Sequence, residues 1–180
     1  MSDSVLDRGG AVREGEGLDA AAVTAWLEAQ GVALEGSAAV TQFAGGASNW
    51  TYRLEYANRD LILRRPPSGT KAKGAHDMGR EYTVQSALRP IYPYVPNMVG
   101  FCSDASVIGS EFYVMDRIAG IIPRKNLPPG MTLSPAQTRQ LCRNMLDRLI
   151  ALHRVDVRAT PLEELGKGSG YVQRLSLIHI

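Results

Sequence analysis

Residues 43–56, FAGGASNWTYRLEY, are the stretch that decides the fold. The alternation that begins at Asn49 indicates a β-strand. The pair Gly45-Gly46 in front of it weakens strand pairing, because glycine loses more conformational freedom on ordering than other residues. Two interpretations are open: the glycines form only a turn, or the backbone there must approach a ligand that a side chain would push away.

Strand patterns continue on both sides of this stretch. Residues 39–44 precede it, and the polar turn NRD joins it to a third strand, so the three segments form an antiparallel meander. A loop rich in Pro, Gly and Lys leads to a helix whose candidate core positions are Tyr82, Val84 and Leu88, and two more strands follow. The order β-β-β-α-β-β is expected over residues 39–44, 49–57, 60–65, 78–90, 98–104 and 110–118.

Two further helices are predicted outside this unit. Asp19 caps a short helix that ends near Gln30. Ser134 and Gln137 form a capping box at the start of a long helix over 135–153. One apolar stripe runs along the long helix, at Leu141, Met145, Leu149 and Leu152. Residues 1–17 are polar and glycine-rich and are expected to form a flexible tail.

The composition is that of an ordinary globular protein. The 180 residues are 44% hydrophobic and 21% charged, with a net charge of +2. That charge is too small to argue for a nucleic-acid surface. Cys102 and Cys142 do not have the spacing of a metal site. The N-terminus lacks an apolar core of signal-peptide length, and no apolar run approaches the ~20 residues of a membrane span. A cytoplasmic location without membrane or nucleic-acid partners is therefore expected.

The order of these pieces carries chemical information. A glycine-rich turn between two strands, a cation at the end of the third and an acid in the next helix are the arrangement of a protein-kinase-like nucleotide lobe. Glycines let backbone N–H groups approach phosphates, the cation neutralises the phosphates, and the acid holds the cation in place. The residues would be Gly45, Gly46 and Ser48, then Arg64, then Glu81.

Five ordered blocks resemble the aminoglycoside phosphotransferase family over about residues 38–174: GGASNWTYRL, LILRRPP, AHDMGREY, FYVMDRIAG and IALHRVD. They are most similar to a branch related to the kinase-like half of some acyl-CoA dehydrogenase fusion proteins. The resemblance implies an α+β fold whose first lobe is a five-stranded antiparallel sheet with one helix. It also implies ATP and Mg²⁺ as cofactors, with Asn49 completing the phosphate loop and with Asp116 and Ile118 at the adenine.

The cation departs from the protein-kinase pattern, because Arg64 stands where protein kinases have Lys. An arginine can bridge phosphate and carboxylate oxygens in a bidentate manner, so the charge is kept while the geometry changes. The neighbouring Arg65 is the alternative. Since side chains alternate along a strand, only one of the two arginines can share the side of Glu81.

The catalytic loop H-G-D-x-x-x-x-N of the family and its acidic metal motif do not occur in the sequence. The resemblance therefore implies an N-terminal fragment, with no catalytic residue and no metal ligand assigned. Its expected parts are a tail (1–17), a nucleotide-binding lobe (18–118), a linker with the start of a helical lobe (119–174), and a non-native end (175–180).

The expected function is the N-terminal part of an ATP-dependent phosphotransferase that acts on a small-molecule hydroxyl. The alternative is a module that binds a nucleotide or a partner protein without transferring phosphate. A nucleic-acid-binding sheet is a more distant alternative, since aromatic residues on a basic sheet are also typical of single-strand binders.

Overall fold

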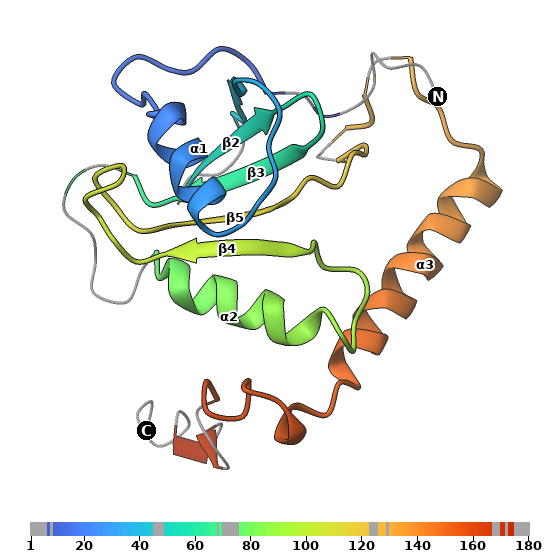
Figure 1. The fold of residues 1–180 in the computed structure, drawn as a ribbon. Coiled ribbons are helices and arrows are strands. Elements are labelled where there is room, and N and C mark those ends of the chain that lie inside the picture. The colour runs from blue at the N-terminus through green and yellow to red at the C-terminus, as the bar shows by residue number, and fades with distance from the viewer. Residues whose placement is uncertain are drawn as a thin grey trace.

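The computed structural model describes residues 7, 9–44, 49–67, 69, 76–122, 126–128, 130–166, 170–171 and 173–174. An antiparallel sheet of five strands lies at its centre, in the order β1-β2-β3-β5-β4 (Figure 1). The strands are β1 (Ala39–Gln42), β2 (Trp50–Glu55), β3 (Asp60–Arg65), β4 (Met98–Cys102) and β5 (Phe112–Asp116). The helices are α1 (Ala20–Ala29), α2 (Met78–Leu88) and α3 (Pro135–His153), and a 3₁₀ turn spans Val157–Ala159. The expected α+β fold, a five-stranded antiparallel sheet with a helix between its third and fourth strands, is confirmed.

The main core lies between the sheet and α1. Alternation along β2 and β3 directs Tyr52, Leu54, Leu61 and Leu63 to one face, where they are fully buried with Val23 and Leu27 of α1. The Trp26 ring meets Phe112 edge-on, with ring centroids 5.0 Å apart. Trp26 also explains Gly100 on β4, because a Cβ at Gly100 would lie 2.8 Å from the indole.

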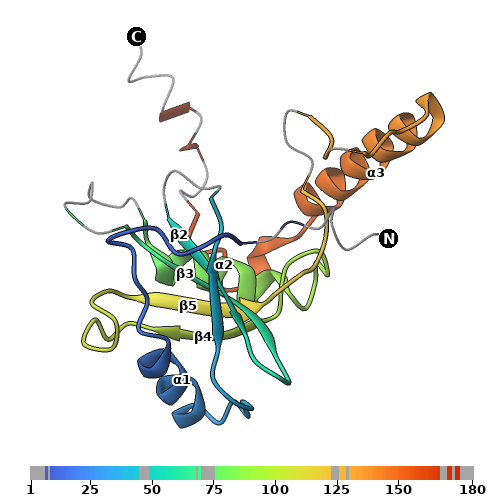
Figure 2. The ribbon, with the colours of Figure 1, turned by 90° about the horizontal axis from the view of Figure 1, so that it is seen from above.

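The opposite face of the sheet carries α2, so the two helices enclose the sheet from both sides (Figure 2). Met78 and Leu88 of α2 are buried, and Tyr82 stacks on Phe101 with ring centroids 5.8 Å apart. Of the three core positions expected in this helix, Leu88 is buried, while Tyr82 and Val84 are only half-buried. The reason is that α2 turns polar residues, among them Glu81, toward the sheet.

Residues 9–17, before α1, follow the sheet edge, whereas the sequence alone predicts a flexible tail over 1–17. Gly10 forms an antiparallel bridge with Gln42 of β1. The backbone N–H of Arg13 donates to the buried Gln42 side chain at 2.9 Å, and the Tyr52 hydroxyl donates to the Glu16 carbonyl at 2.7 Å. These contacts use backbone groups, which a polar and glycine-rich composition does not reveal.

The long helix α3 projects away from the sheet (Figure 1). Its predicted capping box is present, with Ser134 and Gln137 each bonded to the other's backbone. Leu141, Met145 and Leu149 of the apolar stripe are exposed, as expected for a stripe that the described residues leave largely uncovered. No helix within the described ranges has the length and apolar character needed to cross a membrane.

Candidate nucleotide site

A cavity of about 480 Å³ opens on the α2 face of the sheet, where β5 continues into the hinge segment (residues 115–120, MDRIAG). Most of its lining is apolar. The apolar side chains are Phe43, Ile62, Pro96, Met115, Ile118, Ile121 and Ile122. Thr51 and Gln85 add polar groups to the wall. This combination of apolar walls and few polar groups is typical of a small-molecule site.

An ion pair lies along β3 from this cavity. Arg64 Nη1 and Glu81 Oε2 are 3.2 Å apart, and both side chains are about a third exposed, at 30% and 33%. Ile62 and Arg64 share one face of β3, and their Cα atoms are about 7 Å apart along the strand. The predicted facing of Arg64 and Glu81 is confirmed.

Arg65 points to the other face of the sheet. Its guanidinium lies over the Trp50 ring, 5.1 Å from the centroid, and donates to the Ile108 carbonyl at 3.3 Å. The alternation of β3 therefore leaves Arg64 alone beside Glu81, and the alternative assignment to Arg65 is excluded by geometry. Among the described residues, the buried Nε of Arg64 has no hydrogen-bond partner.

Glu81 is held by two more side chains. Asn49 Nδ2 donates to its Oε1 at 2.9 Å, and the Tyr113 hydroxyl donates to its Oε2 at 2.8 Å. Burial is the main reason why the pKa of Tyr113 rises to about 12. The Arg64 charge opposes this rise, and the bond to Glu81 adds to it. Tyr113 therefore stays protonated near neutral pH and donates to the carboxylate without a break.

The predicted loop residue Asn49 is turned into the protein. Its side-chain oxygen lies 2.8 Å from His76 Nδ1 while its amide nitrogen bonds Glu81, and only 4% of the residue is exposed. Asn49 thus joins the start of β2 to α2 and to the residue before its N-cap. His76 has a φ of 65°. Such a positive φ is unusual for a residue other than glycine.

The predicted site residues that remain are Gly45, Gly46, Ser48, Asp116 and Ile118. Asp116 and Ile118 both line the cavity. The Asp116 carboxylate accepts from Asn97 Nδ2 at 3.0 Å, and Ile118 is 68% exposed. Gly45, Gly46 and Ser48 lie outside the described residues. The strands on either side of them, β1 and β2, pair in an antiparallel manner.

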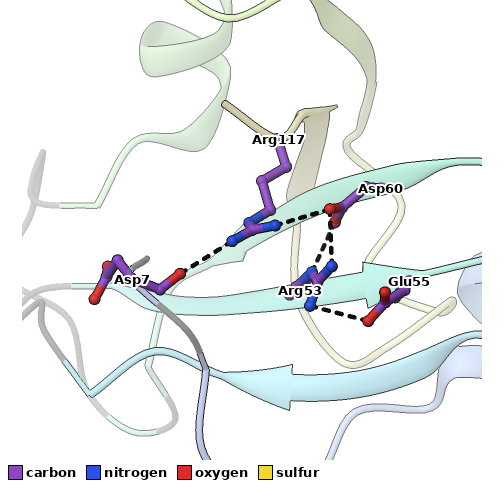
Figure 3. A network of polar contacts seen from close by, with 5 residues as sticks. All are labelled: Asp7, Arg53, Glu55, Asp60 and Arg117. Carbon is purple, nitrogen blue, oxygen red and sulfur yellow. Dashed lines mark hydrogen bonds and ion pairs between the residues drawn. The ribbon is translucent and has the colours of Figure 1, made fainter. Parts of the chain in front are cut away.

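A charged network that the sequence did not indicate flanks the cavity (Figure 3). Arg53 donates to both oxygens of Asp60, at 2.8 and 2.9 Å, and contacts Glu55 at 2.9 Å. Arg117 of the hinge segment donates to Asp60 Oδ2 at 2.9 Å. Burial raises the pKa of Asp60, but the hydrogen bonds from Arg53 and Arg117 outweigh it and lower the pKa below its usual range. Asp60 therefore stays ionised and ties the β2–β3 hairpin to the hinge.

The residues that the structure describes do not fit a metal centre, since they contain no group of three or more His, Cys, Asp or Glu able to hold an ion. They do fit a nucleotide in two respects: an apolar cavity, and a nearby arginine whose buried Nε has no partner among them. No step is assigned to Mg²⁺ on these residues.

Comparison with known proteins gives a consistent result. The model of the phosphotransferase enzyme family matches residues 39–177. The chain is similar to a Ralstonia eutropha protein of known crystal structure, provisionally named an aminoglycoside phosphotransferase, with 33% identity and a TM-score of 0.70. That match covers 88% of this chain and 45% of the other.

Relatives named as acyl-CoA dehydrogenases are similar to most of this chain. Human acyl-CoA dehydrogenase family member 11 is 37% identical over 148 residues, which are 82% of this chain and 19% of the human protein. Mouse acyl-CoA dehydrogenase family member 10 is 38% identical over 74% of this chain and 12% of its own length. The chain thus spans less than a fifth of these relatives.

Proposed function

Because this chain belongs to the phosphotransferase enzyme family, we propose that it forms the nucleotide-binding part of an ATP-dependent small-molecule phosphotransferase. The observation that carries the proposal is the Arg64–Glu81 ion pair beside an apolar cavity at the hinge segment. The whole protein would transfer the terminal phosphate of ATP to a substrate hydroxyl. The part assigned to this chain is to bind and position the nucleotide.

The cavity is the proposed subsite of the base. Its volume of about 480 Å³ lies within the ~300–1,000 Å³ common for small-molecule sites, and its walls are mostly apolar. Ile62 and Met115 would contact one side of a purine ring, and Ile118 would contact its edge. Backbone groups at Asp116 and Ile118 would supply the hydrogen bonds, so the identity of those two side chains matters little.

The phosphates would extend along β3 toward Arg64. One nitrogen of its guanidinium is engaged by Glu81, whereas Nε has no partner within the described part of the chain. An arginine in this state can bind a phosphate oxygen while the carboxylate fixes its direction. Gly45, Gly46 and Ser48 would add backbone and hydroxyl donors from the loop before β2, as glycine-rich phosphate loops do.

Positioning and charge neutralisation supply most of the catalysis in phosphoryl transfer. Arg64 offsets the negative charge of the phosphates, and Asn49 and Tyr113 prevent Glu81 from turning away from it. Mg²⁺, when bound with ATP, would supply further charge neutralisation. The acceptor is proposed only as a small molecule with a hydroxyl group, and a cytoplasmic location is proposed with it.

Calorimetric titration with magnesium-ATP tests the base subsite. We expect measurable binding by the unchanged chain and a loss of about tenfold in Met115→Trp, because the larger ring would fill the cavity. Met145→Trp on the exposed side of α3 is the matched control and should bind normally. A wild-type chain that gives no binding heat and no displacement of a fluorescent ATP analogue contradicts the proposal.

A further inference from the structure

Asp7 lies beside the cavity and contacts the hinge segment through its backbone. Its backbone N–H donates to the Gly120 carbonyl at 3.0 Å, and its carbonyl accepts from Arg117 Nη2 at 3.0 Å. Residue 7 therefore lies against the hinge segment through backbone groups at both of its ends. It is also one of the residues that line the cavity.

The Arg117 side chain is held in place by contacts with Asp60 as well as with Asp7. Its side chain is only 9% exposed, and its Nη1 donates to Asp60 Oδ2. Its backbone N–H donates to the Asp60 carbonyl at 3.0 Å. Arg53 in turn donates to both carboxylate oxygens of Asp60 (Figure 3). The contact of Nη1 with Asp60 orients the Arg117 guanidinium, so that its Nη2 donates to the Asp7 carbonyl.

We propose that the chain at Asp7 is a wall of the base subsite, and that Arg53, Asp60 and Arg117 are positioning residues that hold this wall against the hinge segment. The inference rests on the proposed nucleotide site and extends it. The wall contributes contact area to the base alone, because Arg64 lies farther along β3. Loosening the wall weakens binding of ATP and of adenosine by the same factor.

Two substitutions of Asp7 distinguish the contribution of its backbone groups from that of its side chain. Asp7→Pro removes the N–H that donates to Gly120, whereas Asp7→Ala keeps both backbone groups that carry the contacts. We expect Asp7→Pro to raise the dissociation constants of ATP and adenosine by about tenfold each, and Asp7→Ala to raise them by a smaller factor, because it shortens the side chain but keeps the wall in place. Competition against a fluorescent ATP analogue measures all three proteins.

Arg117→Lys provides a second test inside the network. A lysine can keep contact with Asp60 but lacks the fork that reaches Asp7 at the same time. Equal losses for ATP and adenosine are expected again. Thermal unfolding checks that each variant is folded, and residue 7 lies outside the buried core.

The outcomes distinguish the wall from the site itself. If the unchanged chain binds neither ligand, the proposed function fails. If it binds both, and the folded Asp7→Pro variant binds them equally well, the role proposed for residue 7 is wrong. The proposed nucleotide site is then unaffected. A loss confined to ATP would also overturn it, since residue 7 would then act on the phosphates.

Discussion

Arg64 on β3 and Glu81 on α2 lie 3.2 Å apart across the face of the sheet opposite α1, and the oxygen that Glu81 offers to Arg64 is the one that Tyr113 also bonds. A carboxylate with two donors on one oxygen and Asn49 on the other has little freedom to rotate. The direction of the arginine is therefore set by Glu81 of α2, Tyr113 of β5 and Asn49 in front of β2, and each of these side chains can be replaced separately.

Tyr113→Phe removes one of these supports. We expect a loss of about 1 kcal/mol in the free energy of unfolding, because a half-buried carboxylate loses one hydrogen bond and Gln85 loses an acceptor. ATP affinity should fall as well, since Glu81 becomes free to move. Urea denaturation and calorimetry measure the two effects. Tyr82→Phe on α2, next to Glu81, is the control, and an equal change there would contradict a specific role for the Tyr113 hydroxyl.

Asp60→Asn tests the network at the hinge through pH. The pKa of Asp60 is lowered in the folded state, so its stabilisation is present above the unfolded value of about 4 and is lost as pH falls through the folded pKa. At pH 7 we expect the variant to be less stable by about 1 kcal/mol, a modest figure because Asp60 is partly exposed to solvent.

The difference between the two proteins should shrink when unfolding is measured below pH 4. Asp147→Asn, which removes a carboxylate from an exposed position of α3, is the matched control. A gap between wild type and Asp60→Asn that stays constant from pH 7 to pH 3 would contradict the role given to the Asp60 charge.

Gly100→Ala tests the packing of α1 on the sheet. The new methyl group would lie 2.8 Å from the Trp26 ring, so the helix must shift or the ring must leave its contact with Phe112. Overpacking of this kind costs about 1–3 kcal/mol. Gly17→Ala, where an added Cβ meets nothing within 4 Å, should be nearly neutral in the same denaturation experiment. Equal stabilities for the two variants would contradict the described contact.

The exposed stripe of α3 predicts self-association. Met145 and Leu149 are 64% and 45% exposed and lie on one face of the helix, where apolar side chains without a partner favour contact with other chains. Replacing both with Gln should reduce concentration-dependent association in sedimentation velocity without lowering the unfolding temperature. A chain that stays monomeric at high concentration before any substitution would show that the stripe is already covered.

The sheet and the ion pair could be predicted because their signals are local or periodic. Alternation with period two placed Arg64 and Arg65 on opposite faces, and motif order paired Arg64 with Glu81. The contact between Arg117 and Asp60 joins residues 57 positions apart and has no periodic signal. Contacts at Gly10 and Asp7 run through backbone groups, which composition cannot reveal. Asn49 was expected to face the ligand, and nothing in its neighbours along the sequence indicates its bonds to Glu81 and His76.

The most direct test of the account compares ATP and adenosine binding by wild type, Arg64→Ala and Arg80→Ala. Arg80 lies on the exposed side of α2, and Arg80→Ala removes the same charge without removing a member of the ion pair. We expect Arg64→Ala to weaken ATP binding by about tenfold or more while adenosine binding stays unchanged, and Arg80→Ala to alter neither. Equal ATP affinity in Arg64→Ala and wild type, or equal losses for ATP and adenosine, would contradict the assignment of Arg64 to the phosphates.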